Sequence, residues 1–291
     1  MTKTSTTFED DIKTIQDQYI KKDFPAKDSP QDFEILSTIR YDPNLSETPP
    51  IEYEDISKQN FFLLNEHIDR LNFTLQFFHN LYQIKLDFEI TEEFFLQQLI
   101  TSLKKSEKLM FIPYKIRVLV KLDGSTKIEI HETKNTTNLL FGLFPQVSEF
   151  DLYFDQITTE DDWDIYMNKN STLISPFTSF KTTKRDVYNE ARSILPNKNP
   201  GKEEVLLFNS QNQVMEGSFT NIAIKRYYDG KWITPLLSCG CLCGVTRHFL
   251  LRKNYIEEDI ITIDQISLGT EILLFNGIIG VVKGKVVDLG M

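Results

Sequence analysis

The chain has 291 residues, of which 41% are hydrophobic and 25% charged, as is usual for a globular protein of one large or two smaller domains. Its formal net charge of −10 argues against nucleic acid as a partner, because phosphate binding requires a basic surface. No apolar run approaches the roughly 20 residues of a membrane-spanning helix, and Glu9, Asp10 and Asp11 do not suit a secretory or transit peptide. We therefore expect a cytoplasmic protein that does not contact a membrane.

The first half of the chain alternates strand and helix patterns. Residues 1–30 are polar without a sustained period and predict an extension. FEILSTIRYD, from residue 33, predicts a strand, and residues 60–82 and 91–108 have apolar residues at helical spacing, with Thr91 as a helix cap. A period of two on both sides of Asp123-Gly124 then predicts a hairpin. Residues 31–155 are the predicted N-terminal α+β domain.

The second half begins with a polar, proline-containing stretch. We predict that this stretch, residues 156–179, connects two domains. A helix is expected just past Lys181, followed by alternating strands and turns with a hairpin turn at Asp229-Gly230. Strands in the last 20 residues close the sheet of a predicted C-terminal domain, residues 180–291.

Three motifs in the second half together suit a pyridoxal 5′-phosphate cofactor. They are FKTTKR (180–185), MEGSFTN (215–221) and GVTR (244–247). The cofactor needs a lysine amine for its Schiff base and an acid that keeps its ring nitrogen protonated, and Lys181 and Glu216 would fill these places. Its phosphate is best held by N–H groups at a helix start, as the turn before RHFLLRK provides. The candidate residues of this phosphate cradle are Gly244, Val245 and Thr246.

All three cysteines lie in CGCLC, residues 239–243. An odd number at such close spacing does not make a disulfide framework and fits a reducing compartment. Zinc would need four ligands and usually wider spacing. We therefore predict no metal site, and three small residues packed in a tight loop.

Four patterns in this order give the chain a resemblance to a known family. They are STIRYDP (37–43), LLNEHIDRL (63–71), KTTKR with Tyr188 three residues on, and EGSFTN followed by TP and GCLCGVTR. Over most of residues 33–291 the chain resembles the class IV pyridoxal phosphate enzymes, which include branched-chain and D-amino-acid aminotransferases and aminodeoxychorismate lyases. Within them it is most similar to the fungal type of aminodeoxychorismate lyase.

The resemblance implies a fold and an assembly. The fold would be α+β and of fold type IV, with a smaller N-terminal α/β sandwich domain and a larger C-terminal β-barrel-like α/β domain. Such enzymes are commonly homodimers with the cofactor pocket near the subunit interface.

The resemblance also implies cofactor contacts. Lys181 is favoured over Lys184 as the cofactor lysine, because the family places a residue such as Arg185 four positions after it. His67 is expected to pack or to form hydrogen bonds rather than to act as a base. Arg70 matches the arginine that reaches the phosphate, Asn276-Gly277 matches a second backbone contact with it, and Ser218 and Asn221 would orient the turn and the ring's surroundings.

Thr38 bears on the reaction type. In the lyase branch a threonine here, two residues before an arginine, assists proton transfer, and Thr38 and Arg40 would share one face of a strand. The implied activity is conversion of 4-amino-4-deoxychorismate to p-aminobenzoate and pyruvate for folate synthesis. The substrate's two carboxylates need local cations, for which Arg40 and Arg117 are candidates. The alternatives are an aminotransferase acting on branched-chain, D-amino acid or amine substrates, and a non-catalytic relative that only binds cofactor or a protein.

Overall fold

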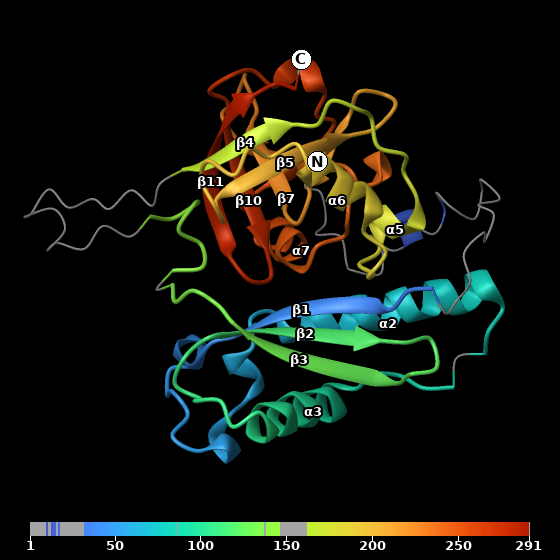
Figure 1. Cartoon of the computed structure of the whole chain (residues 1–291), viewed down its shortest axis with the longest axis vertical. Coiled ribbons are helices and arrows are strands. Elements are labelled where there is room, and N and C mark those ends of the chain that lie inside the picture. Colours follow the sequence, from blue (N-terminus) through green and yellow to red (C-terminus); the bar gives the residue numbers. More distant parts are fainter. Residues whose placement is uncertain are drawn as a thin grey trace, which may run out of the picture. The chain divides into compact units, whose positions relative to one another are not determined.

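The computed structural model describes residues 10, 13–15, 17, 32–85, 87–136, 138–145 and 162–290, so the predicted extension lies almost wholly outside the described residues. The chain forms two compact units (Figure 1). The first comprises residues 1–135 and 176–185, and the second comprises residues 136–175 and 186–291. The domain boundaries expected from the sequence stay a prediction, because compact units defined by contacts need not fold independently.

The described part of the first unit is built on an antiparallel sheet of three strands in the order β1-β2-β3. The sheet confirms both the predicted strand at 33–42 and the hairpin. Ser125 donates its N–H to the Asp123 side chain, and Gly124 has φ +85°, a value that favours glycine at this turn. The strands are β1 (Ile35–Tyr41), β2 (Tyr114–Val120) and β3 (Thr126–Glu132).

Two long helices belong to the same unit (Figure 1). They are α2 (Leu64–Tyr82), which contacts β1, and α3 (Glu92–Lys105). The Thr91 hydroxyl accepts the N–H of Phe94 at 3.3 Å, so the predicted cap is confirmed. Leu71, Leu75, Phe78, Leu99 and Leu103 are almost fully buried, as the helical spacing of apolar residues predicts.

A short segment from later in the chain completes the first unit. It contains the helix α5 (Pro176–Ser179) and runs antiparallel to the start of β1. The Leu36 N–H donates to the Lys181 carbonyl at 2.9 Å, and the Thr183 N–H donates to the Glu34 carbonyl at 2.8 Å. The segment is also fixed by a cluster of aromatic rings, which are Phe33, Phe77, Phe78, Phe177 and Phe180.

The second unit is built on a curled sheet of eight described strands in the order β6-β5-β4-β11-β10-β7-β8-β9 (Figure 1). The β4-β11, β4-β5 and β8-β9 pairs are parallel, and the other pairs are antiparallel. The strands are β4 (Trp163–Met167), β5 (Glu203–Phe208), β6 (Val214–Gly217), β7 (Asn221–Lys225), β8 (Trp232–Pro235), β9 (Glu257–Asp259), β10 (Glu271–Asn276) and β11 (Gly280–Asp288).

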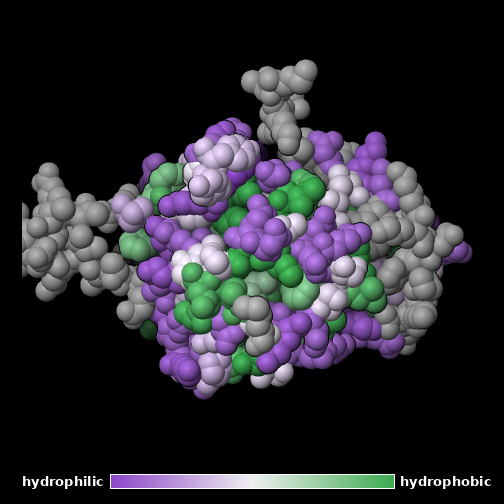
Figure 2. Space-filling model, turned by 90° about the horizontal axis from the view of Figure 1, so that it is seen from above, coloured by the Kyte–Doolittle hydropathy of each residue, from purple (hydrophilic) through white to green (hydrophobic). Residues whose placement is uncertain are grey.

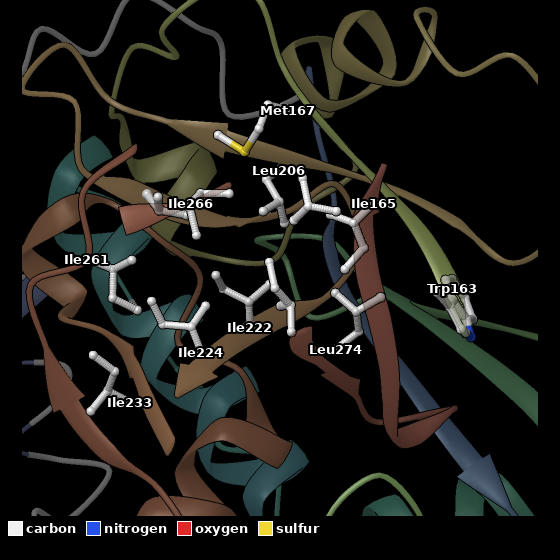
Figure 3. Close-up of a cluster of buried hydrophobic side chains, with 13 residues drawn as sticks. Trp163, Ile165, Met167, Leu206, Ile222, Ile224, Ile233, Ile261, Ile266 and Leu274 are labelled. Atoms are coloured by element: carbon white, nitrogen blue, oxygen red, sulfur yellow. The ribbon is translucent and has the colours of Figure 1, made fainter. Parts of the chain in front are cut away.

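Consecutive residues are buried along β5, β7 and β10. Because successive residues of a strand point to opposite sides, both faces of this part of the sheet are buried. On one face Leu206, Ile222 and Leu274 join a cluster of aliphatic side chains, which Figure 3 shows converging from several strands. On the other face Leu273 and Phe275 of β10 pack with Leu250 of the helix α7 (Val245–Arg252). The strands β5, β7, β10 and β11 therefore have hydrophobic residues in clusters on both sides of the sheet.

Two helices cover the second face. They are α6 (Asp186–Arg192), which begins five residues after Lys181, and α7 (Val245–Arg252), and both agree with the helices predicted at these motifs. Tyr188 and Ala191 of α6 pack on Val205 and Leu207 of β5. Single 3₁₀ turns join the elements of both units, and they are Pro43–Leu45, Tyr53–Asp55, Lys58–Asn60, Leu237–Cys239 and Ile263–Gln265.

The surface mixes residue types. Figure 2 shows hydrophobic residues interspersed with hydrophilic ones over one face of the molecule, a mixture that is ordinary for folded proteins. Within the described ranges, each helix is too short or too polar to span a bilayer.

Candidate active site

Lys181, the predicted cofactor lysine, lies in the first unit and is half-buried. Its backbone is fixed by the hydrogen bond from Leu36 described above. The competing Lys184 has its ammonium 5.1 Å from the centroid of the Phe177 ring, a cation–π contact that gives this lysine a structural partner. These positions are consistent with the choice of Lys181 over Lys184, which stays a prediction.

A buried polar cluster of Ser37, His67 and Arg70 lies in the same unit. The Ser37 hydroxyl is 2.7 Å from His67 Nδ1, and Arg70 Nη2 is 3.4 Å from each of these atoms. Because arginine only donates, Nδ1 accepts and the imidazole proton resides on Nε2. Burial, with the nearby charges of Arg70 and Lys181, holds the pKa of His67 well below its usual range. His67 is therefore a neutral hydrogen-bonding residue, and its buried Nε2 has no partner in the described part of the chain.

The residues predicted for substrate and proton transfer lie along β1 and β2. Thr38 is half-buried and directly opposite Arg117 in the strand register, and Arg40 is two residues further along β1. Arg40 is 2% exposed and donates to the Asp42 carboxylate at 2.7 Å and to the Lys134 carbonyl at 3.0 Å. Arg117 is partly exposed and pairs with Glu129 at 3.0 Å. Both arginines thus have a carboxylate partner within the chain.

Glu216, the predicted acid, is a buried residue of β6 in the second unit. The Tyr188 hydroxyl donates to its Oε1 at 2.7 Å. The Asn221 amide lies 3.4 Å from its Oε2 and donates to the Leu242 carbonyl at 2.9 Å. The tyrosine contact was not expected, because nothing in the sequence links two residues 28 positions apart.

A second unpredicted residue, Glu204 of β5, holds the loop that follows Glu216. Its carboxylate accepts the Ser218 hydroxyl, the Ser218 N–H at 2.9 Å and the Thr220 hydroxyl at 2.8 Å. Arg192 donates to the Ser218 hydroxyl at 2.9 Å. Burial raises the Glu204 pKa, against the lowering effect of these donors. The Ser218 side chain is therefore held by protein groups that fix the turn.

The start of α7 has the features of an anion site. The first N–H groups of a helix have no acceptor within the helix, and the Thr246 hydroxyl is buried without a hydrogen-bond partner among the described residues. Gly244 is the N-cap, and a Cβ there would lie 1.9 Å from Asn221 Oδ1. Only glycine therefore lets α7 begin this close to Asn221. Arg247 anchors the helix by donating to the Pro235 carbonyl at 2.9 Å and to Glu258.

Asn276 and Gly277 form the turn between β10 and β11. The Asn276 amide donates to the Phe219 carbonyl at 3.1 Å, and its oxygen accepts the N–H groups of Ile278 and Ile279. Gly277 is buried in the turn. The Asn276 side chain thereby joins this turn to the loop that Glu204 holds.

The cysteine loop is tightly packed, with Cys239, Cys241 and Cys243 all free and buried. A hydrogen bond with Cys239, together with burial, raises the pKa of the Cys241 thiol well above its usual range. Gly240 has φ +94°, and a Cβ there would lie 2.3 Å from Ile174 Cγ2, so glycine is required. No group of three or more potential metal ligands gathers among the residues that the structure describes.

The sequence over residues 51–287 matches the family model for amino-transferase class IV, and the chain belongs to this family. Its fold is that of the class IV enzymes, fold type IV, as predicted. The family depends on pyridoxal phosphate.

Two named proteins and one solved structure are similar to this chain over much of their length. The chain is 33% identical to the aminodeoxychorismate lyase of Saccharomyces cerevisiae over 262 residues, covering 78% of this chain and 68% of the yeast protein. It is 36% identical over 121 residues to a provisionally named aminodeoxychorismate lyase of Schizosaccharomyces pombe, covering 40% of this chain and 52% of that one. A solved structure of a provisionally named amino-acid aminotransferase from Mesorhizobium loti superimposes with a TM-score of 0.62 at 21% identity, covering 88% of this chain and all of that one.

The residues in each unit fit the family's cofactor. The second unit offers a buried carboxylate for a ring nitrogen, and a helix start with an unpartnered buried hydroxyl for a phosphate. The first unit offers a lysine, an arginine and a neutral histidine whose Nε2 donates to no group in the described ranges. All these groups have the chemistry that pyridoxal phosphate requires.

Proposed function

We propose that the protein is a pyridoxal-phosphate-dependent lyase that converts 4-amino-4-deoxychorismate to p-aminobenzoate and pyruvate. The observation that carries the proposal is the 33% identity to the yeast aminodeoxychorismate lyase over 78% of this chain, a stretch long enough to include most of the motifs. The retained lysine and the buried, hydrogen-bonded glutamate support a catalytic protein rather than a non-catalytic relative.

The residue roles follow from their chemistry. When bound, the cofactor supplies an electron sink for the carbanion formed on the substrate. The Lys181 amine removes the proton from the ring carbon that carries the amino group, and Glu216 keeps a proton on the cofactor's ring nitrogen. Departure of the enolpyruvyl group leaves an aromatic ring, and a proton from Thr38 or Lys181 completes pyruvate.

The remaining cofactor residues hold the phosphate and shape the ring's surroundings. We assign the phosphate to Arg70 and to the helix start at Gly244, Val245 and Thr246, with Asn276 and Gly277 as the second backbone contact. Ser218 and Asn221 act by fixing the loop and the glutamate, in keeping with their contacts to Glu204 and Glu216.

Arg117 is the better of the two candidates for a substrate carboxylate. Arg40 is almost fully buried and has two strong acceptors, so a ligand would have to break a buried ion pair to reach it. Arg117 pairs with Glu129 on a partly exposed face, where exchanging one carboxylate for another costs little.

We further propose that the enzyme serves folate synthesis in the cytoplasm as a homodimer. Three free, buried cysteines are compatible with a reducing compartment, and the net charge of −10 gives no support to a nucleic acid partner. We propose a dimer because enzymes of this family are commonly homodimers, and the molar mass measured by light scattering tests it.

The decisive experiment supplies freshly generated aminodeoxychorismate to the cofactor-loaded protein and follows both products. Equal release of p-aminobenzoate and pyruvate, lost in Lys181→Ala and kept in the matched Lys184→Ala, supports the lyase. Keto acid formed from an amino-acid panel without release of p-aminobenzoate would identify an aminotransferase instead. Retention of both turnover and the cofactor absorption band in Lys181→Ala would overturn the cofactor assignment.

A further inference from the structure

Tyr188 is a buried residue of α6 to which neither the motifs nor the relatives assign a role. Its hydroxyl donates to Glu216 Oε1 at 2.7 Å, and the two side chains are 6% and 2% exposed. The ring packs with Ala191 against Val205 and Leu207 of β5. Because packing holds the ring, the hydroxyl is already aimed at the carboxylate before any ligand binds.

Two further groups near Glu216, the Asn221 amide and the Cys241 thiol, interact with it less directly. The Asn221 amide is 3.4 Å from Oε2 and has a closer acceptor in the Leu242 carbonyl at 2.9 Å. The Cys241 thiol is near enough to feel the charge of Glu216, but its pKa is raised, so it stays neutral. Of these neighbours, the phenol makes the shortest contact with the carboxylate.

A hydrogen bond of this kind stabilises the ionised form of a carboxylate, and burial makes the effect larger than it would be in water. A carboxylate that is a weaker base leaves a shared proton on its partner nitrogen.

We propose that Tyr188 is a positioning residue that keeps Glu216 ionised and oriented, so that the proton of the glutamate–pyridine pair stays on the cofactor nitrogen. The inference rests on the proposed role of Glu216. It adds that the ionisation and orientation of Glu216 are set by a residue of α6, the helix that directly follows Lys181.

The test compares Tyr188→Phe with wild type after loading each apoprotein with pyridoxal phosphate labelled with ¹⁵N in the ring. Loss of a hydrogen bond that stabilises the ionised form should make the Glu216 carboxylate a stronger base, so that it competes better for the shared proton. We expect the ¹⁵N signal at neutral pH to move toward that of an unprotonated pyridine, and the cofactor Kd to rise about tenfold to a hundredfold.

Tyr41→Phe is the matched control, because Tyr41 is also buried and its hydroxyl donates to the Met110 carbonyl at 2.8 Å in the other unit. It should leave the ¹⁵N signal unchanged. If Tyr188→Phe does not fold, 3-fluorotyrosine at position 188 replaces it; at the pH at which the wild-type ring nitrogen is half protonated, this stronger donor should move the signal in the opposite direction.

The outcomes separate the two proposals. A wild-type protein that takes up no cofactor overturns the proposed function and this inference together. A wild-type protein that binds the cofactor, with an unchanged ¹⁵N signal in Tyr188→Phe or an unchanged or reversed response to 3-fluorotyrosine, overturns the role of Tyr188 alone.

Discussion

Gly244→Ala tests the packing at the start of α7. The new Cβ would lie 1.9 Å from Asn221 Oδ1, whereas ordinary contacts are 3.4 Å or longer. The amide must therefore retreat by about 1.5 Å, and a shift of that size breaks its hydrogen bond to the Leu242 carbonyl and its contact with Glu216.

The expected cost follows from the bonds lost. A hydrogen bond between neutral groups contributes about 1 kcal/mol and one to a charged group somewhat more, so we expect a loss of about 2–3 kcal/mol in the free energy of unfolding. For a protein of this size the loss corresponds to a decrease in Tm on the order of 5–10 °C. Thermal unfolding followed by circular dichroism measures it without any ligand.

A double-mutant cycle separates the clash from a general effect of alanine at the helix cap. In an Asn221→Ala background the Cβ has no amide to displace, so the further cost of Gly244→Ala should fall below about 1 kcal/mol, the usual N-cap preference of glycine over alanine. Equal costs of Gly244→Ala in both backgrounds would refute the reasoning.

Three further changes test other contacts. Glu204→Gln should destabilise the protein by about 2–4 kcal/mol, because it disturbs the donors from Ser218 and Thr220. Because the Glu204 pKa is raised, the folded state binds the proton of this carboxyl group more tightly than the unfolded state does. The difference in unfolding free energy between wild type and the variant should therefore shrink as pH rises from about 4.3 through the folded pKa. A difference that grows with pH in denaturant titrations would contradict this. Asp42→Ala should cost about 3–5 kcal/mol, because it removes the carboxylate partner of the buried Arg40 guanidinium, and Arg40→Met in the same chain should restore part of that stability. Thr91→Ala should cost about 1 kcal/mol and Thr91→Ser much less, since only the hydroxyl caps α3; equal melting temperatures for the two variants would argue against the cap.

Local signals in the sequence predicted the elements well. Helical spacing identified α2 and α3, and the Asp-Gly pairs marked both hairpins, because such features depend on neighbouring residues alone. The ion pair of Arg40 also depends on neighbouring residues, because Asp42 lies only two residues further along the chain, directly after β1. The contact of Arg40 with a substrate carboxylate stays a prediction.

Contacts between distant parts of the chain could not be predicted in this way. Two examples are the hydrogen bond from Tyr188 to Glu216 and the one from Ser218 to Glu204. Both depend on the order of strands in the sheet. Periodicity identifies a strand but not its partner. The motifs therefore located the candidate site, and the fold was needed to find the residues that support it.

The place of β11 has a consequence for synthesis of the protein on the ribosome. β11 comes after the other strands described, yet it lies between β4 and β10 and joins the β6-β5-β4 part of the sheet to the β10-β7-β8-β9 part. The nascent second unit cannot complete its sheet until residues 280–288 have left the exit tunnel, and until then β4 and β10 each expose an unpaired edge. Contacts this distant in sequence also fold slowly. A chaperone that shields strand edges would therefore act mainly in the interval between the emergence of β10 and the emergence of β11.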